Sequence, residues 1–252
     1  MTVEVNQAQL HYSVAGEENQ RPVIVLHGGR GIGDHQGDFR TFLPLASQFR
    51  LIGYDQRGCG RSSLTPPFTF EQLTDDVEGV RQTLGQGKKM ALIGGSFGGM
   101  IALCYAVRYP DHLTHLILRG TAPSYHHEEE AVLNYMARLH KASSASMKMV
   151  EKLFSETEDD LELRLIWLAL QPLYYERFDP DAALARTKGM HFHAETHKAL
   201  FKNKHLYDVR DRLKDIKAKT LVIVGGNDWI CPPSQSRIIA QNIPGALSLI
   251  HI

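Results

Sequence analysis

A serine set among glycines forms the strongest chemical motif in this sequence. Ser96 lies in the run Gly94-Gly-Ser-Phe-Gly-Gly99, directly after an apolar run at 90–93 and directly before a helical pattern that starts at Phe97. In that setting a G-x-S-x-G turn holds a serine hydroxyl above the carboxyl edge of a sheet. We predict that Ser96 is a nucleophile rather than part of a glycine-rich structural turn. The amino end of the following helix would favour an oxyanion.

A glycine-rich loop upstream offers the second half of an oxyanion site. His27-Gly-Gly-Arg-Gly31 follows the apolar run 23–26, and glycine lets backbone amides approach a ligand closely. We predict that the N–H groups of Gly29 and Phe97 stabilise the oxyanion that forms when Ser96 attacks. The same loop superficially resembles a nucleotide-binding turn, but no G-x-G-x-x-G spacing follows, so we set that alternative aside.

The elements that position these residues alternate between apolar runs and amphipathic stretches, which is typical of an α/β fold with a mainly parallel sheet. Strands are predicted at 2–6, 10–14, 23–26, 51–54, 90–93, 116–118, 221–224 and 246–252. Helices are predicted at 39–47, 69–84 and 97–109. Continuous apolar strands indicate burial on both faces of the sheet.

The alternation stops between 124 and 217, where the sequence is helical, charged and aromatic. Helical segments are predicted there at 129–140, 146–154, 160–170 and 182–201. Because the strand pattern resumes at Leu221, we predict a helical cap over the sheet end rather than a further helical layer. The predicted division is a core at 1–120, a cap at 121–217 and a second core part at 218–252. The short acidic runs 128–130 and 156–160 are interpreted as solvated helix ends.

Composition excludes several classes of protein. The 252 residues carry 28 basic and 28 acidic side chains and are 43% hydrophobic, which argues against disorder and against a nucleic-acid partner. Three cysteines do not build a disulfide framework. We find no signal peptide and no apolar span long enough for a bilayer. We expect a cytoplasmic protein with a small-molecule substrate and no membrane partner; its oligomeric state stays open.

Together these motifs identify the chain as similar to α/β-hydrolases of the proline iminopeptidase-like group. The resemblance is carried by the two glycine-rich motifs above, by Tyr54-Asp-Gln-Arg-Gly-Cys-Gly-Arg-Ser62 and by Gly225-Gly-Asn-Asp-Trp229. It implies the α/β-hydrolase fold with its helical cap. It also implies that Asp228 is the acid of a catalytic triad, and that Asp55, Arg57 and Arg61 belong to a structural turn.

The histidine of such a triad should follow Asp228 in the chain. His251 is the histidine found there, inside the apolar run 246–252. Strand alternation points its side chain at a sheet face, so we interpret it as a strand residue and a weak candidate for the base. The family places a histidine turn and a closing helix after this strand. Neither is found in this sequence, so we expect a shortened chain, with loss of the base as the alternative.

The resemblance leaves the substrate open. Arg30 stands where the group's loop usually has proline, and Trp229 stands where the aminopeptidases often have glutamate. We therefore predict hydrolysis of a carboxylic ester, thioester or lactone through an acyl-enzyme on Ser96, with Trp229 binding the substrate. Two alternatives remain: a proline iminopeptidase with Glu195 near the amine, and a non-hydrolytic or binding protein.

No cofactor and no metal site is predicted. His191, His193, Glu195 and His197 lie close in sequence, but they lack the H-E-x-x-H spacing of a zinc helix. We interpret them as a polar cap helix. A second aromatic set could form the core of the cap or line an apolar pocket: Trp167, Tyr174, Tyr175 and Phe178. Cys104, in the helix after Ser96, is interpreted as core packing, while Cys59 and Cys231 lie near the turns and have no partner base in the sequence.

Overall fold

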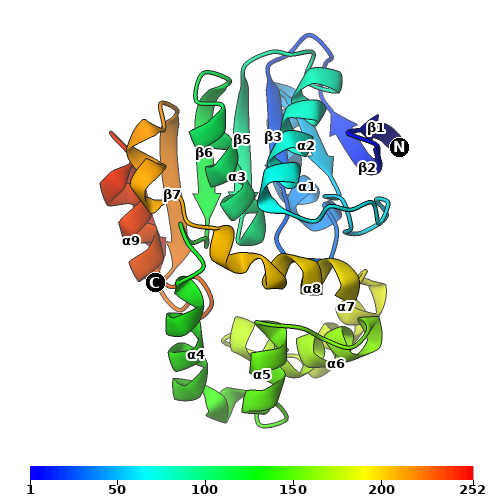
Figure 1. The fold of residues 1–252 in the computed structure, drawn as a ribbon, viewed down its shortest axis with the longest axis vertical. Helices are drawn as coiled ribbons and strands as arrows, with labels where there is room; N and C mark the ends of the chain where they lie inside the picture. The colour runs from blue at the N-terminus through cyan, green and yellow to red at the C-terminus, as the bar shows by residue number, and fades with distance from the viewer. Residues whose placement is uncertain (252) are drawn as a thin grey trace.

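The computed structural model describes residues 1–251, and the side chain of His251 lies outside the described part. The predicted α/β architecture is confirmed: strands of one sheet alternate with helices along the chain (Figure 1). The strands are β1 Thr2–Val5, β2 Ala8–Ala15, β3 Pro22–Leu26, β4 Arg50–Tyr54, β5 Met90–Gly95, β6 Leu113–Arg119, β7 Lys219–Gly225 and β8 Leu247–His251.

The described part of the sheet has eight strands in the order β1-β2-β4-β3-β5-β6-β7-β8. β2 pairs antiparallel with β1 and with β4, and every later pairing is parallel. Since parallel strands end at the same edge, the loops that follow β3, β4, β5 and β7 meet there. Those loops carry the predicted site residues.

Helices α1, α2, α3 and α9 cover the two faces of this sheet. The α-helices of the described chain are α1 Gln36–Phe42, α2 Phe70–Thr83, α3 Phe97–Arg108, α4 His127–Ala137, α5 Met147–Leu153, α6 Asp160–Leu170, α7 Pro180–Gly189, α8 Ala194–Lys202 and α9 Pro233–Asn242. Side chains of α2, α3 and α9 pack into one large core with the strands, while Phe39 of α1 packs on Val23 and Val25 on the opposite face. Leu247 and Leu249 of β8 are exposed.

Helices α4 to α8 lie between β6 and β7 in the chain and below the carboxyl ends of the strands in Figure 1. They have an apolar cluster of their own, which includes Tyr135, Val150 and Leu163 and to which Ile32 and Trp229 of the sheet-edge loops contribute. Asp159 caps α6 by accepting a hydrogen bond from the Glu162 backbone. The division of the chain at 121 and 218 stays a prediction.

The predicted elements agree with the structure to within a few residues, with three differences. The helix predicted at 39–47 is α1 followed by a 3₁₀ turn at Leu43–Ser47. α9 was not predicted. The helix predicted at 182–201 is two helices, because the segment between them bonds to the loop after β3. The Gly33 N–H donates to the His191 carbonyl oxygen at 2.9 Å, and the His193 N–H donates to the Gly31 carbonyl oxygen at 2.8 Å. These contacts replace helical hydrogen bonds that the sequence alone would allow.

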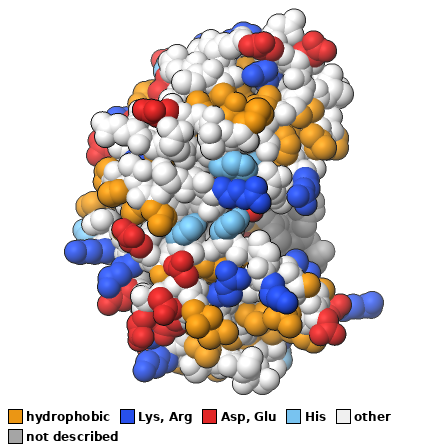
Figure 2. Space-filling view, turned by 90° about the vertical axis from the view of Figure 1, so that its right-hand side faces the viewer, with side chains coloured by type: hydrophobic (Ala, Val, Ile, Leu, Met, Phe, Trp, Pro, Cys, Tyr) orange, Lys and Arg blue, Asp and Glu red, His pale blue; other side chains and the backbone are white. Residues whose placement is uncertain are grey.

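The last predicted strand is confirmed as β8, and Ile252 lies outside the described residues. Among residues 1–251, no helix combines the length and the apolar character that crossing a membrane requires. On the face seen in Figure 2, acidic and basic side chains are interspersed rather than gathered by sign. This mixture agrees with the zero net charge of the sequence.

Candidate active site

Ser96 occupies a strained turn between β5 and α3. Its backbone has φ 50° and ψ −120°, a conformation that costs free energy in a non-glycine residue and is typical of functional sites. The surrounding fold holds it: the Ser96 N–H donates to the carbonyl oxygen of Arg119 at 2.9 Å, and the Thr121 hydroxyl donates to the Ser96 carbonyl oxygen at 2.8 Å. The side chain of Ser96 is half-buried, whereas its neighbours are buried.

The glycines of this turn are required by close packing. A Cβ on Gly94 would lie 2.4 Å from the carbonyl oxygen of Gly98, and one on Gly99 would lie 2.6 Å from Thr121 Cβ. Both distances are far shorter than a Cβ contact allows. The turn could not form in this way with larger residues.

The loop after β3 runs beside Ser96. A Cβ on Gly28 would lie 3.9 Å from Ser96 Oγ, which brings this loop to the serine as predicted. Gly29 has φ +88°, and a Cβ there would lie 2.2 Å from the carbonyl oxygen of Ile32. Only glycine therefore fits the tight turn that presents the Gly29 amide.

Gln56, two residues after the end of β4, ties this loop to the sheet. Its side chain donates to the carbonyl oxygen of His27 at 2.9 Å, and its backbone N–H donates to His27 Nε2 at 3.4 Å. Nδ1 of the same ring donates to the Gly28 carbonyl oxygen at 2.7 Å. Burial lowers the pKa of His27. Both ring nitrogens are thus occupied, so His27 braces the loop although it lines the cavity.

Asp228 lies in the turn after β7. Its Oδ1 accepts hydrogen bonds from the backbone N–H groups of Ile230 and Cys231 at 3.1 and 2.9 Å. Burial raises the pKa of Asp228, and these two N–H groups partly offset the effect. No hydrogen bond to Oδ2 is recorded within the described chain, and a Cβ on Gly120 would lie 2.7 Å from that oxygen. Oδ2 therefore remains available as an acceptor.

His251 is the last residue of β8, opposite Gly225 of β7. Its predicted place in a strand is confirmed, and its side chain lies outside the described part of the structure.

One cavity of about 930 Å³ joins the predicted site residues. Ser96, Phe97, Gly29, Asp228 and Trp229 all line it, although they come from three separate loops. A cavity of this size suits a small-molecule substrate.

Aromatic side chains form much of the cavity wall. Trp229 is 2% exposed and packs edge-on against Phe154 and Tyr174, with ring centres 6.5 and 5.7 Å away. Three residues of the predicted aromatic set also line the cavity: Trp167, Tyr174 and Tyr175. Phe178, the fourth, is 36% exposed and does not line it in the described structure.

Of two polar side chains in the cap, one lies outside the cavity wall and the other contradicts our expectation. Glu195, which the proline iminopeptidase alternative would place near the amine, is exposed on α8 and is absent from the described cavity wall. Glu128, expected on a solvated helix end, is buried and pairs with Arg30 at 3.1 Å and with Lys204. The helical pattern could not predict the pair between Glu128 and Arg30, because Arg30 lies on a loop far away in the chain.

Arg30 and Asp34 are charged residues of the cavity wall to which we gave no role from the sequence. Arg30 is 7% exposed, whereas Asp34 is half-buried. Asp34 Oδ1 accepts a hydrogen bond from the Gln36 backbone, and no ion pair to Asp34 is recorded among the described residues. In the sequence, the one signal that Arg30 faces the cavity was its position in the glycine-rich loop.

The turn after β4 braces the structure, as the sequence implied. Arg57 is 1% exposed and forms two hydrogen bonds to the Asp76 carboxylate, at 2.5 and 2.7 Å. It also donates to the carbonyl oxygens of Thr65 and Asn6. Arg61 contributes its backbone N–H, which donates to Asp55 at 2.8 Å.

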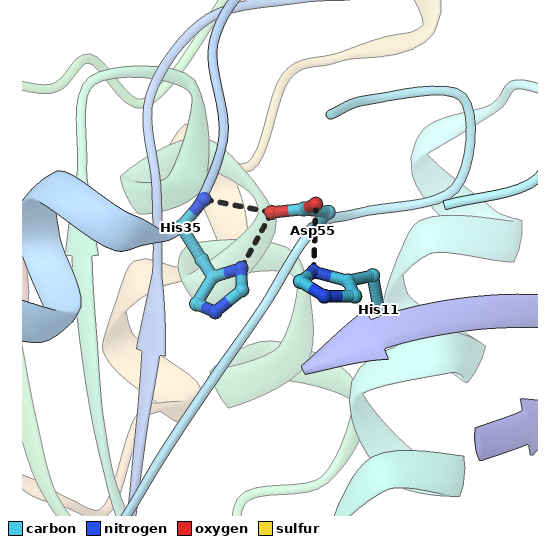
Figure 3. A group of neighbouring side chains, drawn as sticks. All are labelled: His11, His35 and Asp55. Atoms are coloured by element: carbon cyan, nitrogen blue, oxygen red, sulfur yellow. Dashed lines mark hydrogen bonds and ion pairs between the residues drawn. The ribbon is translucent and has the colours of Figure 1, made fainter. Parts of the chain in front are cut away.

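Two histidines flank Asp55 (Figure 3). The His35 backbone and Nδ1 both donate to Asp55 Oδ1, at 2.8 and 2.5 Å, while His11 Nδ1 lies 3.4 Å from Oδ2. Burial alone would raise the pKa of Asp55, but the hydrogen bonds from His35 and Arg61 outweigh it and lower the pKa to about 2.

This group is the one set within the described residues whose donor atoms lie close enough for a metal ion. Ligands around an ion at about 2.1 Å are about 3 Å apart, whereas His35 Nδ1 and Asp55 Oδ1 are in direct hydrogen-bond contact at 2.5 Å. We therefore assign the group to holding the loop before α1.

The histidine cluster of the cap does not gather around a common point. His193 Nε2 contacts the Gly60 carbonyl oxygen at 2.9 Å, and His197 Nδ1 contacts the Arg30 carbonyl oxygen at 3.1 Å. His193 precedes α8 rather than forming part of it. His197 is buried, whereas Glu195 on the same helix is exposed.

The cysteines do not offer a nucleophile. Burial raises the pKa of Cys59 and of Cys104 to about 12, and raises that of Cys231 well above its usual range. Their thiols therefore stay protonated at neutral pH.

Comparison with known proteins points to one family. Residues 21–250 match the family described as alpha/beta hydrolase fold. The chain is 48% identical over 247 residues to Proline iminopeptidase PfmaB of Pestalotiopsis fici, covering 97% of this chain and 88% of that protein. It is 28% identical to a proline iminopeptidase of Lactobacillus delbrueckii subsp. bulgaricus, covering 94% of this chain and 84% of that protein.

Solved structures share the same architecture. The enol-lactonase from Burkholderia xenovorans superposes with a TM-score of 0.67 and 25% sequence identity, over 99% of this chain and 90% of that chain.

Proposed function

Because this chain belongs to the alpha/beta hydrolase family, we propose that it is a serine hydrolase that releases an amino-terminal proline residue through an acyl-enzyme on Ser96. The choice of this substrate is supported by the 48% identity to Proline iminopeptidase PfmaB over 97% of the chain. This proposal replaces our first expectation of an ester substrate, which becomes the second candidate.

Ser96 supplies the nucleophile in this proposal. Its hydroxyl oxygen attacks the carbonyl carbon of the proline residue, and its proton would pass to the histidine base that the family's chain order places after Asp228. That imidazolium would then protonate the departing amine, which leaves the acyl-enzyme for water to hydrolyse. Asp228 would accept the other N–H of that imidazole, which the available Oδ2 supports. The charge on Asp228 then stabilises the imidazolium that forms.

The N–H groups of Gly29 and Phe97 would bind the negative oxygen of the tetrahedral intermediate. Support comes from the loop carrying Gly29, which runs beside Ser96, and from the place of Phe97 as the first residue of α3. Removing one donor from such a site typically costs about 100-fold or more in turnover.

Asp34 is the cavity carboxylate best placed to hold the proline ammonium. It lines the cavity with Ser96, and its carboxylate has no recorded ion pair in the described chain. A substrate ammonium would lose hydration in the cavity, and a carboxylate offsets that cost.

The test compares turnover of proline p-nitroanilide with that of alanine p-nitroanilide. We expect proline to be preferred, Ser96→Ala to lower turnover by about 1,000-fold or more, and Asp34→Asn to raise KM more than it lowers kcat. Glu195→Gln is the control, because Glu195 is exposed and lies outside the cavity wall. Equal turnover of both anilides, or no effect of Ser96→Ala, would exclude the proposal.

Hydrolysis of an ester or lactone is the second candidate, favoured by the buried cation Arg30 in the cavity wall. A cation there disfavours a substrate ammonium nearby. The likeness to the enol-lactonase agrees with this candidate. Faster turnover of p-nitrophenyl acetate or γ-butyrolactone than of proline p-nitroanilide, lost in Ser96→Ala, would select it. Failure of a fluorophosphonate to label Ser96 would favour a non-hydrolytic protein.

A further inference from the structure

Arg30 gives the buried part of the cavity wall a positive charge. Its guanidinium carbon lies 4.2 Å from the ring centre of Phe201 and 5.6 Å from that of Phe97, and both rings line the cavity. Phe97 directly follows Ser96 in the chain. The cation therefore packs against the residue that follows Ser96, in the same cavity wall as the serine and between two aromatic rings.

The surroundings do not fully neutralise this charge. Glu128 is one carboxylate shared by two cations, Arg30 and Lys204. Neither Glu128 nor Lys204 belongs to the described cavity wall. His127 does line the cavity, but burial and the nearby Arg30 lower its pKa to about 4, so it is neutral at pH 7. Arg30, Glu128, Lys204 and the neutral His127 together carry one net positive charge, which reaches the cavity wall through Arg30.

Arg30 also retains hydrogen-bonding capacity. A guanidinium has five N–H donors, and two recorded bonds use them within the described residues: one to Glu128 at 3.1 Å and one to the weak acceptor Met100 Sδ at 3.5 Å. A planar guanidinium with unused donors and a net positive charge matches the two oxygens of a carboxylate.

We propose that Arg30 binds a carboxylate of the substrate, so that the preferred substrates carry a carboxylate in addition to the acyl bond that Ser96 attacks. This rests on the proposed function, since it needs an acyl substrate at Ser96. Two substrate types meet the requirement: a short proline peptide with its free terminal carboxylate, and the half-ester of a dicarboxylic acid. The same contact would favour either over its uncharged counterpart.

The first test measures binding without hydrolysis. Phenylacetate and its uncharged counterpart phenylacetamide are titrated into the Ser96→Ala protein by calorimetry at low salt. We expect phenylacetate to bind about tenfold more tightly or better, as for a charge-assisted hydrogen bond in a partly dry site. Adding Arg30→Met should remove this preference, whereas Arg30→Lys should keep part of it because the charge remains.

Arg186→Met is the matched control, since Arg186 also lines the cavity but is exposed. It should change the preference by less than about threefold because water screens an exposed charge. Equal binding of the two ligands, or an unchanged preference in Arg30→Met, overturns the proposal. In that case the Arg30–Glu128 pair only links the loop after β3 to α4.

The second test uses the active protein and two matched substrate pairs. These are Pro-Phe against Pro-Phe amide, and p-nitrophenyl hydrogen glutarate against p-nitrophenyl pentanoate. We expect the kcat/KM ratio of charged to uncharged substrate to fall about tenfold or more in Arg30→Met for at least one pair. Unchanged ratios in both pairs would refute a substrate role. If the wild type hydrolyses neither pair, the proposed function fails, while the binding test still decides whether Arg30 holds a carboxylate.

Discussion

Gly98 of helix α3 lies directly against the backbone of Leu26 at the end of β3. A Cβ on Gly98 would be 2.4 Å from the Leu26 carbonyl oxygen and 2.5 Å from that of His27. Because backbone atoms leave little room to move, the turn that holds Ser96 and the loop that carries Gly29 are packed as one unit. The geometry between nucleophile and oxyanion donors depends on this contact.

Replacing Gly98 with alanine should therefore disturb both stability and activity. We expect Gly98→Ala to lower the free energy of unfolding by about 3 kcal/mol, the upper range for overpacking, and to lower kcat more than it raises KM. Urea unfolding and steady-state kinetics measure the two effects. Gly189→Ala is the control, since nothing lies within 4 Å of a Cβ there; a loss of similar size in the control would contradict this explanation.

The ionised carboxylate of Asp228 should lower the free energy of unfolding while it raises turnover. Burial raises its pKa, so ionising it at pH 7 costs more free energy in the fold than in the unfolded chain. We expect Asp228→Asn to leave the free energy of unfolding at pH 7 unchanged or higher, while turnover falls by about 10,000-fold, as for an uncharged triad residue. A variant that is clearly less stable than the wild type would show instead that the carboxylate holds the turn after β7.

The ionised carboxylate of Asp55 should stabilise the folded protein at pH values above its pKa. Its pKa is lowered from 3.8 to about 2, so its stabilising contribution is present above about pH 4 and is lost as pH falls through about 2. The shift corresponds to about 2 kcal/mol. Asp55→Asn should remove this contribution and place an amide donor against the N–H groups of His35 or Arg61. Unfolding curves at pH 7 and pH 3 should therefore differ less in the variant than in the wild type.

Two buried histidines should make stability fall at mildly acidic pH. Burial lowers the pKa of His127 and of His197 from 6.5 to about 4. The unfolded chain then binds protons more readily than the folded one between about pH 6.5 and pH 4, so stability declines across this window as pH falls. By pH 5 each histidine should cost about 2 kcal/mol. The double variant His127→Gln and His197→Gln should lose most of the difference between pH 7 and pH 5 in urea unfolding; an undiminished difference would assign it to other groups.

Local signals in the sequence determined the fold class and the candidate nucleophile. The strand before Ser96, the glycines around it and the helix after it are neighbours in the chain, so their pattern is readable without the fold. The same holds for Gly29 and for Asp228, each of which follows an apolar strand. Parallel strands then place these residues at one edge.

Only the tertiary structure decided what faces the substrate. Glu128 and Arg30 are 98 residues apart in the chain, and no helical or strand period connects them, so a helix-end glutamate and a loop arginine became a buried pair only through folding. Likewise, Glu195 is exposed outside the described cavity wall, and the segment 190–193 is not helical but forms backbone hydrogen bonds with Gly31 and Gly33. Periodicity indicates which residues form an element, whereas the charge and shape of the cavity arise from contacts between elements.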